Sequence, residues 1–422
     1  MKKERTDHQH HDSSRKQLII SLAIFIVLAT ATVLLVLYGK GYRLGFQTGE
    51  PQLTKTGILH VTSEPTGAQV YIDDHLTTAT NNTVNLTPGN YKVTIAKEGF
   101  NDWHKDIEIK QEVVSNADAT LYPKAPSLQS VSTFGVDSVT IDPSETKLAM
   151  QISSQSASKN GIYLFDMTDR SFPVLAGQSK STQLANDTLD TFSTAHLTWS
   201  PDGKQILAII SATPDNITYY LLQADTFNEI PQDITATVQT TLDLWETQRE
   251  EKHAALLKTL KSKVRAFAKG YFSILAWSPD EKKILYQATE TGQIPIFLTP
   301  RRIGNNLPYE RRDLEKGAMY VYNIAEDLNT RVVESMDTLC EGKAIESCAQ
   351  PFRWMPDSRH LLFINDKKVN LVEDDGSNMT TIYAGPFTDQ YVFPWSDGSK
   401  VVILTNLNNT SVAPTLYTIG LK

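Results

Sequence analysis

One strand–turn–strand unit recurs five times after residue 137, and this repetition limits the possible folds more than any other feature of the chain. Each copy has a short strand, a tight polar turn and an apolar strand. The copies are SVTIDPSETKLAMQI (138–152), LTWSPDGKQILAII (197–210), LAWSPDEKKILYQA (275–288), FRWMPDSRHLLFIN (352–365) and VFPWSDGSKVVILT (392–405). A unit of this size cannot bury its apolar face alone, so neighbouring copies must stack on one another. We therefore expect a mainly β array.

The turns of these units have a consistent chemistry. Proline presets φ, and aspartate accepts hydrogen bonds from backbone amides two residues further on. Four of the six tryptophans stand just before the turns and are expected to pack between units: Trp199, Trp277, Trp354 and Trp395. Fourth strands are predicted at Phe227–Ile230 and Thr381–Ala384, among others. A radial array must protect its last edge, so Ser127–Thr133 is predicted to complete the last unit.

Repeats of this W-S-P-D-G-K type resemble the TolB-like and WD-type β-propellers, over residues 124–422. The resemblance implies a ring of blades, and the five units predict five four-stranded blades, or six if an irregular blade lies between the second and third units. It indicates architecture and says little about function.

The stretch between the second and third units, about 233–269, has a different pattern. Its apolar residues recur with a helical period, with acidic residues early and basic residues late, as the helix dipole favours. The apolar stripe includes Trp245, Leu260 and Val264. We expect an inserted helix or helical pair, which either packs as a lid on its own propeller or docks a partner.

A single apolar run lies near the N-terminus. Residues 18–38 carry no charge and, as a helix, span roughly 31 Å, which matches the hydrocarbon core of a bilayer. A cleaved signal peptide normally has an apolar stretch of about 7–15 residues, so an uncleaved membrane anchor is favoured. Five basic residues precede the run and two follow closely, which predicts a cytoplasmic tail at 1–17 and a single pass with the C-terminal domains outside.

Short alternating strands follow a linker at 39–55. The segments SEPTGAQVYIDD (63–74), LTPGNYKVTIAKEGFNDWHKDIEI (86–109) and ATLYP (119–123) resemble the PEGA domain, a small β-sandwich of microbial surface proteins. The resemblance covers 56–123. Asp74 stands where the family usually has glycine, and Asp tolerates the left-handed conformation better than most residues. The resemblance implies a surface spacer or interaction role and no catalysis.

The net charge of −8 argues against a nucleic-acid partner. No nucleophile elbow, metalloprotease helix, phosphate loop or dinucleotide fingerprint is present. We therefore expect no catalytic residues, metal or cofactor. The repeated turn aspartates are expected to stabilise their own turns rather than bind calcium together.

Two groups of residues are candidates for other roles. Cys340 and Cys348 close a short loop, and outside the cytoplasm they are candidates for a disulfide. A basic cluster in the third unit is either a solvated loop or a contact for an anionic polymer or lipid headgroups, and it comprises Arg301, Arg302, Tyr309, Arg311 and Arg312.

The sequence thus predicts a membrane-anchored binding or scaffold protein of the cell envelope. The bilayer would hold residues 18–38, and the propeller would bind an envelope protein or a surface polysaccharide. The alternative is an enzyme, a lyase or glycan hydrolase, with its site in the central funnel of the propeller. That alternative requires acids or a metal converging on the innermost strands. The oligomeric state is left open.

Overall fold

The computed structural model describes residues 9–39, 43–47, 50–54, 56–132, 134–168, 181–213, 216–302, 306–333, 352–388 and 390–422. The chain forms two compact units. The first contains residues 1–95, 105–119 and 303–308, and the second contains residues 96–104, 120–302 and 309–422. Each unit is described by itself.

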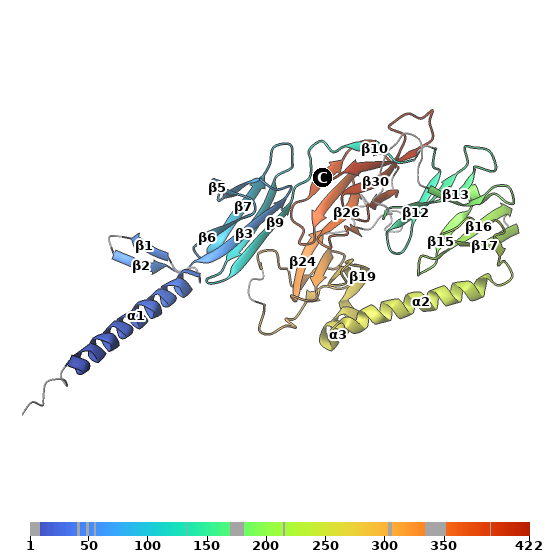
Figure 1. Ribbon diagram of the computed structural model, residues 1–422. Coiled ribbons are helices and arrows are strands. Elements are labelled where there is room, and N and C mark those ends of the chain that lie inside the picture. Colours follow the sequence, from blue (N-terminus) through green and yellow to red (C-terminus); the bar gives the residue numbers. More distant parts are fainter. Residues whose placement is uncertain are drawn as a thin grey trace, which may run out of the picture. The chain divides into compact units, whose positions relative to one another are not determined.

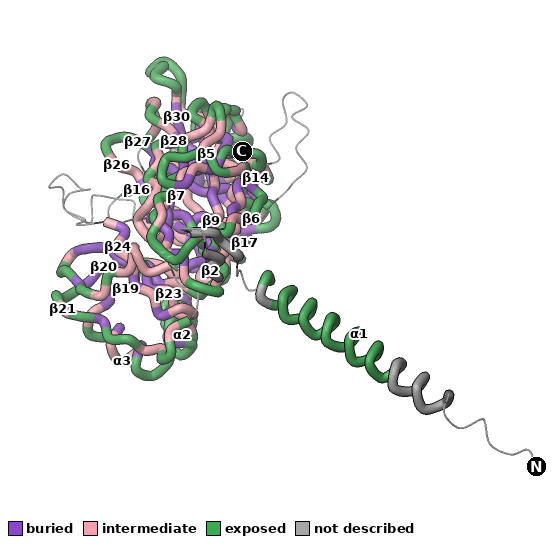
Figure 2. Tube along the Cα trace, turned by 90° about the vertical axis from the view of Figure 1, so that its left-hand side faces the viewer, coloured by how far each residue is buried: buried purple, intermediate pink, exposed green. Residues whose placement is uncertain are grey.

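The first unit begins with helix α1 (Gln9–Gly39). Its segment Leu18–Val36 is long and apolar enough to cross a membrane, and its large apolar side chains are exposed (Figure 2). Part of the stretch predicted as a linker forms an antiparallel hairpin of β1 (Arg43–Gln47) and β2 (Glu50–Thr54).

Two antiparallel sheets follow in the first unit. One has the order β6-β3-β9 and the other β5-β4-β7-β8. The strands are β3 (Gly57–Glu64), β4 (Gln69–Ile72), β5 (His75–Ala79), β6 (Asn82–Leu86), β7 (Gly89–Ala96), β8 (Trp103–Ile109) and β9 (Val114–Thr120). Every second residue of β3 from Gly57 to Ser63 is buried, as in a sheet with one face in a core. Asp73 and Asp74 both have positive φ in the two-residue turn between β4 and β5, so Asp74 does adopt the left-handed conformation.

The second unit contains five four-stranded antiparallel sheets, which correspond to the five predicted repeats (Figure 1). Each starts with the strand–turn–strand unit. Sheet 1 has β11 (Ser138–Ile141), β12 (Lys147–Ile152), β13 (Gly161–Asp166) and β14 (Ser181–Asn186). Sheet 2 has β15 (His196–Trp199), β16 (Gln205–Thr213), β17 (Asn216–Gln223) and β18 (Gln232–Asp233), and a 3₁₀ turn, η1 (Phe192–Thr194), precedes it.

The remaining sheets follow the same plan. Sheet 3 has β19 (Phe272–Trp277), β20 (Lys283–Ala288), β23 (Met319–Asn323) and β24 (Leu328–Val333), and its long loop carries the short pair β21 (Gly292–Gln293) and β22 (Asp313–Leu314). Sheet 4 has β25 (Arg353–Trp354), β26 (His360–Asn365), β27 (Lys368–Glu373) and β28 (Thr380–Tyr383). Sheet 5 has β29 (Val392–Pro394), β30 (Lys400–Thr405), β31 (Thr415–Gly420) and β10 (Leu128–Ser130).

Strand β10 closes the array. It pairs antiparallel with β31, with Leu128 opposite Ile419, so the strand predicted within Ser127–Thr133 does complete the last sheet. A propeller ring needs this closure because an unpaired last edge would stay open to other chains.

Two predicted fourth strands have different outcomes. The one at Thr381–Ala384 is confirmed by β28. The one at Phe227–Ile230 is wrong, since the outer strand of sheet 2 is β18. The carboxamide of Asn228 donates to the carbonyls of Gln223 and Thr226, which favours a turn over a strand at this point.

The apolar cores lie between neighbouring sheets. Buried side chains join sheets 1 and 2, sheets 3 and 4, sheets 4 and 5, and sheets 5 and 1. Three of the four tryptophans pack as predicted: Trp199 between sheets 1 and 2, Trp354 between sheets 3 and 4, and Trp395 between sheets 5 and 1. The prediction is wrong for Trp277, which packs on the cluster that sheet 3 forms with the insertion.

Sheets 2 and 3 are instead bridged by the insertion, which forms α2 (Val238–Thr259) and α3 (Ser262–Tyr271). Trp245, near the start of α2, packs on Leu207 and Ile234 of sheet 2. Leu260 and Val264, around the break between the helices, pack on sheet 3. The apolar stripe is therefore buried on the chain's own sheets.

Candidate functional site

A cavity of about 730 Å³ lies where the first strands and turns of sheets 1, 3, 4 and 5 meet α2. First strands of neighbouring sheets touch here, β19 against β25 and β25 against β29, so the cavity occupies the inner side of the array. Its lining residues are Pro143, Ser144, Glu145, Thr146, Lys252, Leu256, Leu275, Ala276, Trp277, Ser278, Pro279, Glu281, Phe352, Arg353, Trp354, Pro356, Pro394 and Ser396. This volume is within the range of about 300–1,000 Å³ that is usual for ligand pockets.

The repeats themselves bring these residues together. In each unit the turn places one residue in the left-handed region, at φ between 55° and 70°. These residues are Glu145, Gly203, Glu281, Ser358 and Gly398. Glycine adopts such a φ without strain, whereas other residues incur a cost of order 1 kcal/mol or more. Glu145 and Glu281 are two of the three non-glycine residues, and both line the cavity.

An ion pair crosses the cavity wall between sheets 1 and 4. Arg353 Nη1 donates to Glu145 Oε1 at 3.0 Å, and the guanidinium of Arg353 also lies over the ring of Phe393, 5.2 Å from its centroid. Burial raises the pKa of Glu145, and Arg353 partly opposes this rise. The carboxylate is therefore less well stabilised than its ion pair suggests.

Two further charges line the cavity. Lys252 comes from α2, and within the described residues it makes no hydrogen bond or ion pair. Glu281 is exposed in its turn. Sequence reasoning missed Glu145, Lys252 and Arg353. The signal for Glu145 was its place at the glycine position of the repeat, and no local signal marked Arg353.

The turn aspartates act within their own turns. Asp202 accepts hydrogen bonds from Ser200 Oγ at 2.6 Å and from the amide of Lys204 at 3.1 Å, and the Ser200 hydroxyl lowers the pKa of Asp202. Asp280 repeats this arrangement with Ser278 and Lys282. These contacts agree with the predicted role in turn stabilisation. Among the described residues, no three His, Cys, Asp or Glu side chains are placed to hold a metal ion.

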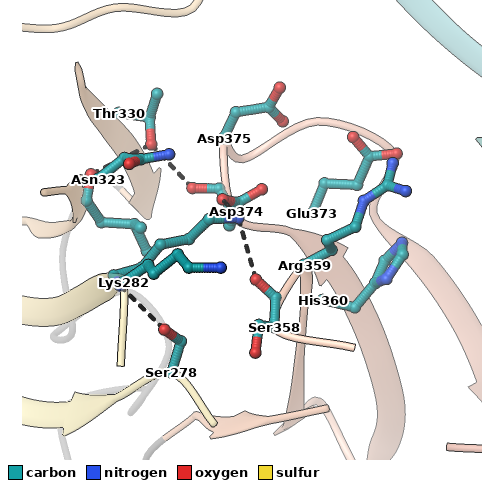
Figure 3. A network of polar contacts seen from close by, with 12 residues as sticks. Ser278, Lys282, Asn323, Thr330, Ser358, Arg359, His360, Glu373, Asp374 and Asp375 are labelled. Carbon is teal, nitrogen blue, oxygen red and sulfur yellow. Dashed lines mark hydrogen bonds and ion pairs between the residues drawn. The ribbon is translucent and has the colours of Figure 1, made fainter. Parts of the chain in front are cut away.

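Sheets 3 and 4 are fastened beside the cavity by a polar network (Figure 3). Lys283 Nζ pairs with Asp374 Oδ2 at 2.5 Å and donates to the carbonyl of Ser358 at 3.0 Å. Thr330 Oγ1 donates to the carbonyl of Asp374 at 2.8 Å. The backbone amide of Lys283 donates to Ser278 Oγ, and Ser278 lines the cavity. The network therefore holds two walls of the cavity in place.

The predicted basic cluster is partly neutralised. Arg301 donates to both oxygens of Glu310, and Arg312 Nε donates to Glu310 Oε1 at 2.6 Å. The partners of Glu310 lower its pKa against the effect of burial. The other predicted members, Arg302, Tyr309 and Arg311, stand in the same loop, and Arg302 and Arg311 are exposed. None of the five lines the cavity.

Cys340 and Cys348 lie outside the described residues, so the disulfide between them stays a prediction.

Comparison with known proteins identifies one domain. The PEGA domain family matches residues 56–125, in agreement with the predicted resemblance. Among curated proteins, none matches the chain significantly by sequence.

Solved structures similar to the chain have low sequence identity to it, and they include a β-propeller domain. A protein assigned as TolB from Agrobacterium tumefaciens is 15% identical, with 67% of this chain and 78% of that chain covered and a TM-score of 0.22. TolB from Acinetobacter baumannii is 12% identical, with 84% and 63% covered and a TM-score of 0.23. The β-propeller domain of the Trilobed protease from Pyrococcus furiosus is 12% identical, with 87% and 96% covered and a TM-score of 0.21. The sheet topology of the chain itself, five four-stranded antiparallel sheets within the described residues, indicates a propeller.

Proposed function

We propose that the chain is a membrane-tethered binding protein of the cell envelope, and that its central cavity receives a segment of a partner protein. The cavity carries this proposal. It is large enough for a ligand, is walled by apolar and aromatic side chains, and holds a few convergent charges, the composition typical of a binding site.

The apolar helix supports the tether. Residues 18–38 would span the bilayer, with residues 1–17 in the cytoplasm and both the PEGA domain and the propeller outside. Labelling with a membrane-impermeant maleimide tests this topology in intact cells. After Cys340→Ser and Cys348→Ser, a cysteine introduced by Thr77→Cys should label, and one introduced by Ser13→Cys should label only after lysis. The reverse pattern contradicts the topology.

A photo-crosslinker tests the cavity. Leu275 lines the cavity and is 41% exposed, so p-benzoylphenylalanine at this position should crosslink one dominant protein in intact cells. Ile296 belongs to the same sheet region, is 54% exposed and does not line the cavity, which makes it the matched control. Equal crosslinking from both positions, or from neither, contradicts partner binding in the cavity. Crosslinking to polysaccharide would favour a glycan ligand instead.

One observation favours an enzyme as the second candidate. Glu145 and Glu281 line the same cavity, and glycan hydrolases use two carboxylates across the scissile bond. The pKa of Glu145 is also raised by burial, as suits a general acid. Glu145 is engaged by Arg353, however, and this favours its ionised form. Release of reducing ends from envelope polysaccharide, abolished by both Glu145→Gln and Glu281→Gln, would decide for the enzyme.

A further inference from the structure

We propose that the cavity selects a carboxylate on an extended peptide, and that this carboxylate replaces Glu145 on Arg353. The proposal rests on the proposed function, because it assumes that a partner segment enters the cavity. It adds that the ligand is negatively charged, that Arg353 recognises it and that Glu145 competes with it for Arg353.

Arg353 keeps its place without Glu145. Its guanidinium lies over the face of Phe393, 5.2 Å from the ring centroid, and the side chain is only 20% exposed. Stacking on an aromatic ring positions the guanidinium, and a ligand carboxylate that meets it in its plane can take the place of Glu145. The arginine is therefore preorganised for an anionic ligand.

Glu145 holds its place weakly by comparison. It occupies a turn position with φ of 55°, where Gly203 and Gly398 stand in two of the other repeats. Its side chain is 37% exposed, and ion pairs of exposed side chains contribute little to stability. Burial disfavours its charged form more than Arg353 favours it. A ligand carboxylate carries no turn strain of its own, so it can compete with Glu145 for Arg353.

The rest of the lining suits a peptide. Four prolines line the cavity together with Trp277, Phe352 and Trp354, whereas the lining contains no asparagine or glutamine among the described residues. Apolar side chains of a peptide pack on such a wall. Lys252 places a second cation on the wall, supplied by α2. The lining thus favours an acidic residue with apolar neighbours.

Binding of capped heptapeptides to the detergent-solubilised full chain tests the proposal. The probes are Ac-Ala-Leu-Pro-X-Leu-Pro-Ala-amide with Glu, Gln or Lys at X, and an oligogalacturonate serves as an acidic glycan. We expect the Glu peptide to bind at least 10-fold more tightly than the Gln and Lys peptides, and its affinity to fall as salt rises. Glu145→Gln should tighten Glu-peptide binding about 5-fold, and Arg353→Met should weaken it at least 10-fold.

A second ion pair provides matched controls. Arg331 Nη1 and Glu315 Oε1 form a pair of 2.9 Å that does not line the cavity, so Arg331→Met and Glu315→Gln should leave peptide binding unchanged. Two results overturn the inference. One is equal affinity of the unsubstituted protein for the Glu and Gln peptides, and the other is a Glu145→Gln protein that binds the Glu peptide no more tightly than the unsubstituted protein does. Tight Arg353-dependent binding of oligogalacturonate alone overturns the peptide ligand. If Arg353→Met does not fold, the Glu145→Gln comparison decides.

The two proposals can fail separately. If Leu275 crosslinks to a protein partner but the chain does not prefer the Glu peptide, the proposed function stands and the inference of a ligand carboxylate fails. No crosslinking from Leu275 removes the proposed function itself.

Discussion

Replacing Trp245 by alanine should release the first half of α2 from sheet 2 and leave the sheets folded. Trp245 is 3% exposed and is the buried residue of this helix, where it packs on Leu207 and Ile234. Truncation of a buried tryptophan costs about 3–5 kcal/mol. The cost falls locally, because α3 has its own anchors in Val264 and Ala268.

Hydrogen exchange measures this effect directly. A loss of about 3 kcal/mol in the local opening free energy corresponds to roughly 100-fold faster exchange in the residues of α2 around Trp245. The control is Leu244→Ala, one residue away in the same helix and 55% exposed, which should change the exchange rate less than about threefold. If hydrogen exchange in α2 does not change, or if all five sheets lose protection together, Trp245 is not the residue that holds α2 on sheet 2.

Four further predictions concern other parts of the chain. Asp202→Asn should make the melting temperature fall less steeply at acid pH. The pKa of Asp202 is lowered on folding, so its carboxylate contributes stability above the unfolded-state pKa and loses it as the pH falls through the folded-state pKa. An unchanged fall in the melting temperature at acid pH contradicts this. Asp327→Ala should destabilise by about 3–5 kcal/mol in urea unfolding, since the buried carboxylate accepts from the amides of Phe297 and Leu298 and faces Arg312. Gln129→Pro should lower the melting temperature by several degrees by removing a donor from β10, unless closure by this strand is dispensable. Ile26→Arg should move the protein out of the membrane fraction, and unchanged fractionation would count against the anchor.

The local chemistry of the repeats made much of the fold predictable. The Pro-Asp turns and the tryptophans before them recur in sequence, so the turn hydrogen bonds of Asp202 and the packing of Trp199 followed from pattern alone. The helical stripe around Trp245 likewise predicted the insertion. The fourth strand of sheet 2 was missed, because a single side chain, Asn228, bonds the backbone there and outweighs the strand propensity of its neighbours.

The cavity could not be predicted in the same way. Arg353 and Glu145 are 208 residues apart, and they meet only because the sheets are arranged around a common centre. Lys252 joins them because α2 bridges two sheets. Such partners depend on the arrangement of whole sheets, which local patterns do not encode. Arginines near residue 301 do stand out in the sequence, and two of them, Arg301 and Arg312, are paired with Glu310.

The pairing of β10 with β31 has a consequence for biosynthesis. The two strands are 289 residues apart where Thr418 meets Gln129. At about 5–20 residues per second, β10 emerges from the ribosome roughly 15–60 s before its neighbour exists. During that interval sheet 5 is incomplete, and both β10 and the edge of sheet 1 can meet other nascent chains. The array therefore cannot close until synthesis has passed Gly420.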